Sequence, residues 1–375
     1  MLRRGLPLLL ALLLVGVGGT AAAATAPELS ARAYLIESAV DGTTLAARAP
    51  DEPRAIASIT KLMTVLVARA RTRLDDVVVV PESATRIGES TVALAAGERL
   101  TVRDLALAAL IASANDAAAA LAIHVAGSEH GFVELMNAEA RRLGLGETQF
   151  ENPHGLDEPG HVSSARDVVT LLRAALRDPF VRTWAGRRTA TLSDGRRLRT
   201  TNDLLGRLPS LFAGKTGHTD DAGWSEVAAA RGAGVTVFAS VLGAPSREQR
   251  DDDLERLLAW GLARYRPSRV VDTGRVYATA ATGWGLADVG LVARAPVVRP
   301  ASVSRPLVER VVVPEVVALP VAAGDVLGEV RILDGRRLVA RAPLVADRSV
   351  SEPGLLGKMG FVARRTVHHL VGFVS

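Results

Sequence analysis

The sequence of 375 residues predicts an α+β fold, in which an antiparallel sheet flanked by helices is followed by a small all-β domain. Up to residue 266, helical patterns alternate with short paired strands. From 268 to 346 the helical periodicity disappears, and valine-rich runs are separated by glycine and proline. A last segment, 353–375, returns to helical spacing. Hydrophobic residues make up 48% of the chain, which suffices for a sizeable core.

The N-terminal segment, residues 1–24, has the pattern of a secretory signal peptide. Two arginines precede an apolar run from Leu6 to Val17, and Ala22 and Ala24 occupy the small-residue positions of a cleavage site. The run is short for a membrane span, and an uncleaved anchor is the alternative interpretation. We therefore expect the body of the protein to be exported.

Local signals predict the elements of the first domain, residues 27–266. Asp41-Gly42 predicts the turn of a hairpin, and Thr101 followed by Asp104 predicts the start of a helix. Helices are expected at 59–70, 105–111, 116–126, 132–143, 165–176 and 249–265, strands at 33–36, 43–47, 77–80, 224–230 and 235–241, and a further hairpin at 189–199.

The second domain, residues 268–346, is expected to contain only short strands, with a turn at Asp334-Gly335. In the segment 353–375, apolar residues fall on one broad helical face and basic residues on the other. This pattern is typical of a helix that lies in the plane of an anionic membrane surface. A helix packed against the β-domain is the alternative.

The composition excludes several classes of function. The net charge of +5 suits an acidic partner, but no block of Lys and Arg is interleaved with aromatic residues, so nucleic acid is the partner we expect least. The chain has no cysteine, which excludes disulfides, thiolate catalysis and cysteine-based zinc sites.

Ser58 and Lys61 lie three residues apart at the start of the helix expected at 59–70, so they share a helical face. A serine hydroxyl becomes a good nucleophile when a neighbouring base takes its proton. A lysine is such a base when it is neutral, and burial lowers its pKa towards neutrality. The same spacing also fits an exposed serine beside a snorkelling lysine, so the pair alone is not decisive.

Two further motifs, Ser113-Ala-Asn115 and Lys215-Thr216-Gly217, make the pattern specific, because together the groups suit acyl transfer through a serine ester. We expect Ser113 to relay a proton to the leaving amine, and Asn115 to bind the peptide backbone and hold Lys61. Lys215 and Thr216 suit a substrate carboxylate, and Gly217 permits a close approach. The Ser58 N–H is one expected donor to the oxyanion.

These motifs, with Phe150-x-Asn152-Pro153-His154-Gly155-Leu156 and Lys215-Thr216-Gly217-His218-Thr219, resemble those of the D-alanyl-D-alanine carboxypeptidases of the low-molecular-mass penicillin-binding protein type. The resemblance implies a catalytic domain of the β-lactamase/DD-peptidase fold with a helical subdomain, a small β-rich domain and a membrane-anchoring C-terminal helix. It also implies that the His218 N–H is the second oxyanion donor, and that Lys215, Thr216 and His218 line the carboxylate pocket.

The resemblance further implies the partners and the location. The substrates would be peptidoglycan stem peptides ending in D-Ala-D-Ala, the covalent inhibitors β-lactams, and the location the periplasmic side of the cytoplasmic membrane or the cell envelope. No cofactor or metal is implied, although His154, His161 and Asp157 are a conceivable metal set. A β-lactamase with Glu151 as water activator, a DD-endopeptidase and a non-enzymatic envelope scaffold are the alternatives.

Two departures from the family pattern concern substrate preference. The family commonly has Asp-Gly-hydrophobic before Lys-Thr-Gly, where this chain has Phe212-Ala213-Gly214. Some relatives place an arginine near the carboxylate pocket, where this chain has Thr200-Thr201-Asn202. Arg199 is a possible substitute.

Overall fold

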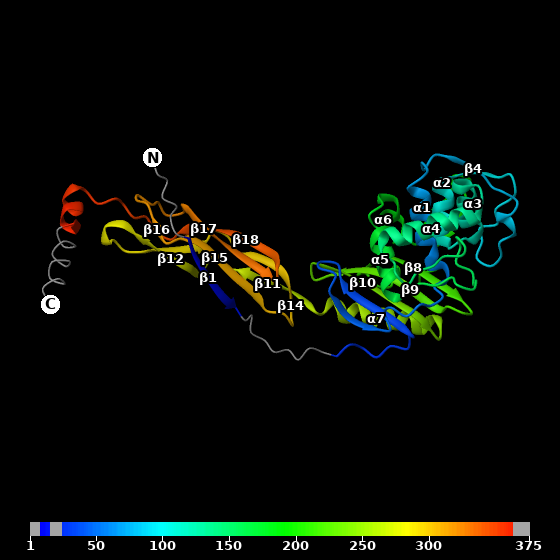
Figure 1. The fold of residues 1–375 in the computed structure, drawn as a ribbon, viewed down its shortest axis with the longest axis horizontal. Coiled ribbons are helices and arrows are strands. Elements are labelled where there is room, and N and C mark those ends of the chain that lie inside the picture. Colours follow the sequence, from blue (N-terminus) through cyan, green and yellow to red (C-terminus); the bar gives the residue numbers. More distant parts are fainter. Residues whose placement is uncertain (1–7, 16–24, 363–375) are drawn as a thin grey trace. The chain divides into compact units, whose positions relative to one another are not determined.

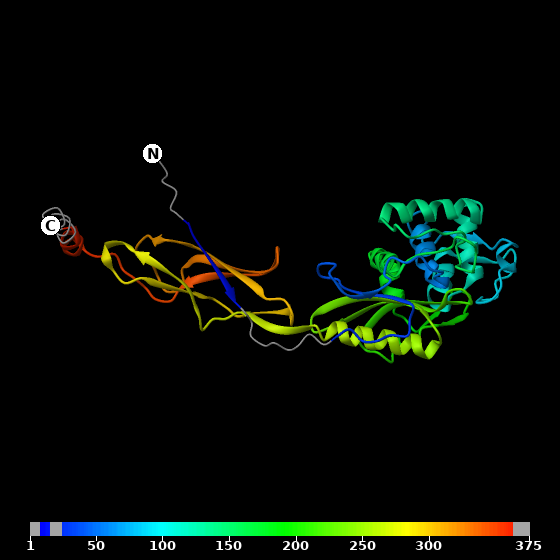
Figure 2. The same ribbon diagram turned by 60° about the horizontal axis from the view of Figure 1, so that its bottom comes forward.

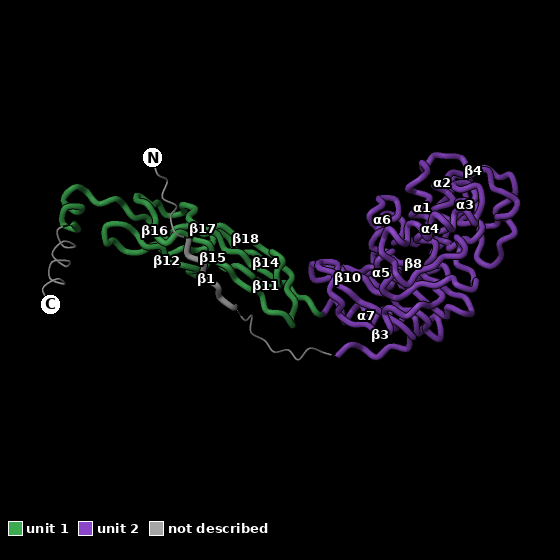
Figure 3. Tube along the Cα trace, in the orientation of Figure 1, with its two compact units in different colours: residues 1–24, 264–375 green, residues 25–263 purple. Residues whose placement is uncertain are grey.

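The computed structural model describes residues 8–15 and 25–362, and it contains two compact units. One unit comprises residues 25–263, and the other is formed by the chain from residue 264 onward together with the N-terminal segment (Figure 3). Each unit has its own hydrophobic core, as independent folding units require.

A five-stranded antiparallel sheet is the centre of the first unit (Figure 1). Its order is β3-β2-β10-β9-β8, which leaves one edge of β8 without a strand partner among the described residues. The strands are β2 (Ala33–Ser38), β3 (Thr44–Arg48), β8 (Leu211–Thr219), β9 (Gly223–Gly232) and β10 (Val235–Ala244).

Helices cover both faces of this sheet, because successive side chains of each strand point to opposite faces. Ile36 and Val237 pack on one face with the leucines of α7 (Arg247–Leu262), whereas Leu35 and Phe238 belong to the core on the other face, with α5 (Ala165–Ala175). Figure 2 shows α7 running along the lower face of the sheet.

The remaining helices form a helical subdomain on the α5 side. Its start signals are those expected: Thr101 and Asp104 form a capping box, and the Ser164 hydroxyl caps α5. The helices are α1 (Lys61–Arg69), α2 (Val102–Leu107), α3 (Asn115–Ala126), α4 (Glu129–Leu143) and α6 (Pro179–Trp184). Two small antiparallel strand pairs accompany them, β4 (Val77–Val79) with β5 (Arg99–Thr101) and the hairpin of β6 (Thr189–Thr191) with β7 (Arg197–Arg199).

The second unit is rich in β-structure, as predicted. A seven-stranded sheet has the order β1-β15-β17-β18-β13-β12-β16, and β11 pairs with β14 separately. The strands are β1 (Leu8–Val15), β11 (Tyr265–Val271), β12 (Val276–Thr282), β13 (Val289–Ala293), β14 (Val297–Ser302), β15 (Leu307–Pro314), β16 (Val316–Val317), β17 (Val326–Asp334) and β18 (Arg337–Ala346).

Three local expectations differ from the structure. The helix expected at 249–265 ends at Leu262, because Tyr265 already pairs with Ser302 in the β11–β14 ladder. The helix expected at 59–70 begins as a 3-10 turn, Ala57–Thr60, before α1. Part of the expected signal segment, Leu8–Val15, is a strand paired with β15.

The expected amphipathic helix is described only in part. Residues 355–362 are helical, with Leu355 and Leu356 exposed and the Phe361 ring 5.9 Å from that of Trp284. Residues 363–375 of the prediction lie outside the described part. No helix in the described ranges is both long and apolar enough to cross a bilayer.

Candidate active site

Ser58 lies in the 3-10 turn that leads into α1, with Ile56, Ala57 and Ile59 buried around it. Ala57 has a φ of 49°, a left-handed conformation that is rare for alanine. The β8 strand approaches this turn closely, since a Cβ placed on Gly217 would lie 2.6 Å from the Ile56 carbonyl oxygen and 3.2 Å from the Ser58 nitrogen. Only glycine fits there without displacing backbone atoms.

Lys61 is fully buried at the start of α1, and three oxygens surround its amine. Its Nζ lies 2.7 Å from the Ser58 Oγ, 2.6 Å from the Asn115 Oδ1 and 2.6 Å from the His154 carbonyl oxygen. None of these oxygens belongs to a carboxylate. A neutral amine fits this set, because its two hydrogens serve Asn115 and His154 while its lone pair faces the Ser58 hydroxyl.

The pKa of Lys61 is lowered well below its ordinary value, first by burial and then by the positive charge of Lys215. Lysine is scarce in this chain: of its 45 lysines and arginines, only Lys61, Lys215 and Lys358 are lysines. Because arginine does not lose its proton in proteins, lysine is the residue required where a buried cation must become neutral.

The loop that follows Phe150 holds the His154 carbonyl against Lys61. Its Asn152 amide donates to the Leu156 carbonyl and accepts from the Gly155 N–H, which closes the loop on itself. Gly155 has a φ of 87°, and a Cβ on it would lie 2.1 Å from the Ala57 carbonyl oxygen. The sequence identified this loop only as a family signature, since a backbone carbonyl that orients a lysine has no residue signature.

Ser113 and Lys215 form the second part of the site. Ser113 has a left-handed conformation, with φ of 61° and ψ of 29°, at the end of a π-helical turn, Ala108–Ala112. Its Oγ accepts from Lys215 Nζ at 2.8 Å, and Lys215 also donates to the Thr216 carbonyl at 2.9 Å. The partner of Ser113 is thus Lys215. Such strained residues and π-turns occur frequently at functional sites.

Asn115 at the start of α3 is engaged on both sides of its amide. Its Oδ1 accepts from Lys61, as the sequence led us to expect, and its Nδ2 donates to the Gly88 carbonyl at 3.0 Å. The amide donor that we expected to face a peptide substrate therefore contacts the chain itself in this structure.

On β8, Thr216 and His218 follow Lys215 along the free edge. The Oγ1 atoms of Thr216 and Thr201 lie 2.7 Å apart, so Thr201, in the segment where some relatives place an arginine, contacts the expected carboxylate pocket directly. The exposed His218 ring stacks on Trp224, with the ring centres 3.9 Å apart. This stacking holds the side chain of His218 against β9.

A buried charged cluster beneath β8 was not predicted. Glu226 is opposite Thr216 in the β8–β9 ladder, fully buried, and accepts from Asn202 Nδ2 at 2.5 Å. Its other oxygen lies 3.5 Å from the buried Arg250 Nε. A Cβ on Gly214 would lie 3.2 Å from the Glu226 carboxylate. The glycine, which stands where the family commonly has a hydrophobic residue, therefore leaves space for this cluster.

Burial controls the charges of this cluster. It raises the pKa of Glu226 to about 7 and lowers the pKa of Lys215 to about 7. The negative Glu226 carboxylate raises the pKa of Lys215 and so opposes the effect of burial, whereas the positive charge of Arg250 lowers it further. The charge of Lys215 is therefore sensitive to Glu226 near neutral pH.

The histidine and aspartate that suggested a metal set have other partners. The neutral ring of His161, whose pKa burial lowers to about 4, contacts the Thr60 hydroxyl at 2.8 Å through Nε2 and accepts from the Glu151 N–H. Asp157 accepts from the Thr219 hydroxyl at 2.6 Å. Within the described residues, no three histidine, aspartate or glutamate side chains are grouped to hold a metal.

Comparison with known proteins identifies the family. A sequence profile described as D-alanyl-D-alanine carboxypeptidase matches residues 20–246, more than half of the chain. The Escherichia coli D-alanyl-D-alanine carboxypeptidase DacD is 31% identical over 349 residues, which cover 89% of this chain and 90% of DacD.

Solved structures agree with this family. Penicillin-binding protein 5 from Haemophilus influenzae has a TM-score of 0.64 and 28% identity, covering 88% of this chain and 99% of its own. Penicillin-binding protein 6B from Escherichia coli has a TM-score of 0.63 and 29% identity, and the match covers 87% of this chain and 98% of its own. The chain therefore belongs to the D-alanyl-D-alanine carboxypeptidase family of low-molecular-mass penicillin-binding proteins and is a serine DD-carboxypeptidase.

Proposed function

We propose that this enzyme removes the terminal D-alanine of peptidoglycan stem peptides through an acyl-enzyme on Ser58, and that β-lactams acylate the same serine. The observation that carries the proposal is the 2.7 Å contact between Ser58 Oγ and a buried lysine whose partners are all neutral oxygens. A general base needs this proximity and a lowered pKa.

In the first step Ser58 attacks the carbonyl of the penultimate D-alanine while Lys61 takes the hydroxyl proton. The N–H groups of Ser58 and His218 stabilise the oxyanion. The amide bond breaks, and the proton that Lys61 took from Ser58 passes through the Ser113 hydroxyl, which contacts Lys215, to the leaving D-alanine amine, so that Lys61 is neutral again. Water then hydrolyses the ester and restores the Ser58 hydroxyl.

The other site residues hold the substrate. Lys215 and Thr216 bind the terminal carboxylate, and Gly217 lets β8 lie close to the Ser58 turn. Asn115 orients Lys61 and binds the peptide once its amide donor is released from Gly88. The free edge of β8 adds the peptide as a further strand.

The test of this chemistry uses two measurements on the same protein. Released D-alanine is measured with a peptide that ends in D-Ala-D-Ala, and the adduct formed with penicillin is mapped by mass spectrometry. We expect release by the wild type, an adduct on Ser58 and neither with Ser58→Ala. Absence of both in the wild type contradicts the proposal. Nitrocefin turnover much faster than peptide turnover identifies a β-lactamase instead.

We also propose that the protein is exported and is bound peripherally to the membrane through residues 353–375, whose exposed apolar residues include Leu355 and Leu356. Deletion of 353–375 should release the protein from membranes and leave activity on a soluble peptide intact. A membrane fraction that the deletion does not change contradicts the anchor.

A further inference from the structure

Glu89 lies in a loop beside Asn115, and no step of the proposed chemistry uses its carboxylate. The residues on either side of it are both bound to Asn115. The Asn115 Nδ2 donates to the Gly88 carbonyl at 3.0 Å, and the Asn115 N–H donates to the Ser90 carbonyl at 2.6 Å. The Glu89 side chain is exposed. The fold therefore places a carboxylate next to a residue that we expect to touch the substrate.

The backbone of Glu89 has a left-handed conformation, with a φ of 64°. This conformation is unfavourable for a glutamate. Ala57, before the Ser58 nucleophile, and Ser113 share it, and among the non-glycine residues with positive φ in the described part of the chain Glu89 is the one that carries a charge. Strained residues are concentrated at active and ligand-binding sites. A role of the side chain explains why a glutamate occupies this position.

Further hydrogen bonds hold the loop independently of the asparagine side chain. The Ser90 hydroxyl donates to the Ala112 carbonyl at 3.1 Å. The buried Asp116 carboxylate accepts from the Val92 N–H, also at 3.1 Å. Glu89 therefore keeps its place when a substrate enters the site.

The Glu89 carboxylate has no cation of its own protein as a partner. Within the described residues it forms neither an ion pair nor a hydrogen bond, and Arg86, three positions earlier, pairs with Glu82. Its charge nevertheless acts on the site. Burial and the charge of Lys215 lower the pKa of Lys61, and the charge of Glu89 opposes them. The carboxylate is therefore near the reacting groups and free to bind a cation.

The position of Glu89 indicates which half of the substrate it meets. Lys215 and Thr216 are expected at the terminal carboxylate, which belongs to the leaving half. Asn115 binds the peptide by exchanging the Gly88 carbonyl for a carbonyl of the substrate, so that group lies on the acyl half and beside Glu89. The side chain of the residue that precedes D-Ala-D-Ala is then the substrate group within reach of the carboxylate.

We propose that Glu89 binds a positively charged amine on the side chain of the residue that precedes D-Ala-D-Ala, and so selects substrates with a cationic acyl half. This inference rests on the proposed function and adds the class of substrate that the site prefers. The ion pair is exposed to solvent, where such pairs are weak, so we expect a preference of about two- to fivefold.

The test uses two peptides that differ in one charge. Both consist of an α-N-acetylated lysine followed by D-Ala-D-Ala, and the side-chain amine is free in one and acetylated in the other. Released D-alanine gives kcat/KM of the full-length protein for each. The wild type should prefer the free amine by about two- to fivefold, and high ionic strength should reduce this ratio.

Three variants assign the preference to one carboxylate. Glu89→Gln should cleave the two peptides equally well, and Glu89→Lys should prefer the acetylated one, because the charge at this position is then reversed. Glu255→Gln is the control and should keep the wild-type ratio, since Glu255 lies on α7, across the sheet from the helical subdomain. Each ratio is taken within one variant, so a partly unfolded variant changes the two rates but not their ratio.

Two results overturn this inference: equal cleavage of the two peptides by the wild type, and a preference that survives Glu89→Gln. The second would show that Glu89 acts only through Asn115 or Lys61, even if both rates fall. A wild type that cleaves neither peptide contradicts the proposed function instead. Calorimetric binding of the two peptides to Ser58→Ala protein, with and without Glu89→Gln, then decides the role of Glu89 without turnover.

Discussion

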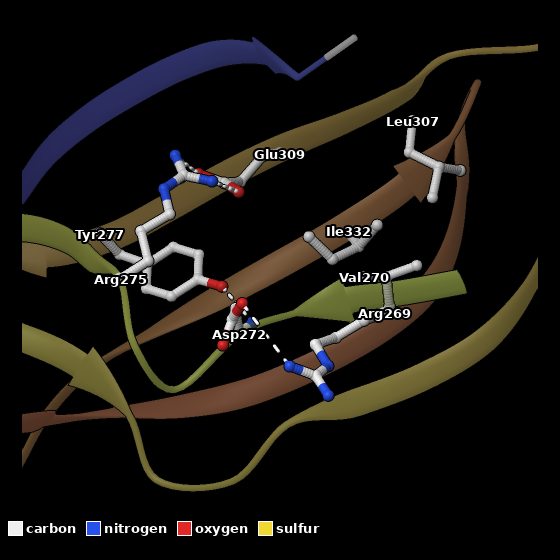
Figure 4. A pocket seen from close by; sticks show the side chains of 8 residues that line it. All are labelled: Arg269, Val270, Asp272, Arg275, Tyr277, Leu307, Glu309 and Ile332. Atoms are coloured by element: carbon white, nitrogen blue, oxygen red, sulfur yellow. Dashed lines mark hydrogen bonds and ion pairs between the residues drawn. The ribbon is translucent and has the colours of Figure 1, made fainter. Parts of the chain in front are cut away.

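Each of the two units buries a charged side chain, and each treats it differently. In the second unit Glu309 is 3% exposed and accepts two hydrogen bonds from Arg275, both of 2.9 Å (Figure 4). In the first unit Lys61 is equally inaccessible, but its contacts are a hydroxyl, an amide oxygen and a backbone carbonyl. Glu309 has a charged partner, an arrangement that stabilises a fold. Lys61 has only neutral oxygen partners, an arrangement that suits a general base.

The difference shows why burial alone does not identify a functional residue. A bidentate pair lets each charge compensate the other. A buried cation that lacks a carboxylate partner loses its proton more readily. Four predictions examine this comparison.

The largest effect is expected from the removal of the base. Lys61→Ala and Lys61→Arg should both lower the rate of acylation by penicillin by about 10²- to 10⁴-fold, since arginine keeps the charge but does not accept a proton. Labelling with a fluorescent penicillin measures the rate. Lys358→Ala is the control and should label like the wild type. Normal labelling of Lys61→Arg would show that the base lies elsewhere.

The second prediction turns the unpaired lysine into a paired one. Asn115→Asp places a carboxylate at the atom that lies 2.6 Å from Lys61 Nζ. The carboxylate stabilises the charged amine and raises the pKa of Lys61. Because Lys61 acts as a base only when it is neutral, the acidic limb of the pH profile of kcat/KM should move to higher pH by about 1–3 pH units. Asn115→Ala loses the same amide without adding charge, so its limb should not move upward. Identical profiles of the two variants contradict the prediction.

The third prediction concerns the carboxylate beneath β8. Lys215 binds a carboxylate only while it is charged, and its pKa is about 7, so kcat/KM should fall as the pH rises through that value. The Glu226 carboxylate raises the pKa of Lys215, so Glu226→Gln should move this alkaline limb to lower pH, by less than about one unit.

Glu255→Gln is the control for this variant, because Glu255 lies on α7 but pairs with Arg207 at the surface. An alkaline limb that stays in place in Glu226→Gln would show that the buried cluster is only structural.

The smallest effect on activity is expected in the second unit. Arg275→Ala leaves Glu309 buried without its partner and should destabilise that unit by about 1.5–3 kcal/mol, with no change in penicillin labelling. Hydrogen exchange of β15 and β17 measures the loss. Adding Glu309→Gln should restore part of the protection, because no charge then stays buried. A labelling rate that falls with Arg275→Ala contradicts the separation of the two roles.

Much of the fold follows from local signals. The capping box of Thr101 and Asp104 and the hairpins at 33–47 and 189–199 have the positions expected, since turn and cap chemistry is local. The end of α7 was predicted three residues too late, because the pairing of Tyr265 with Ser302 overrides helical propensity.

The sequence by itself determined which groups the site contains, because serine, lysine and asparagine carry their chemistry with them. Only the tertiary structure decided how they are paired: the His154 carbonyl reaches Lys61, and Ser113 contacts Lys215. It also placed Glu226 opposite Thr216 in the β8–β9 ladder. These contacts join residues distant in sequence, and burial sets the charge of each lysine, so no local pattern encodes them.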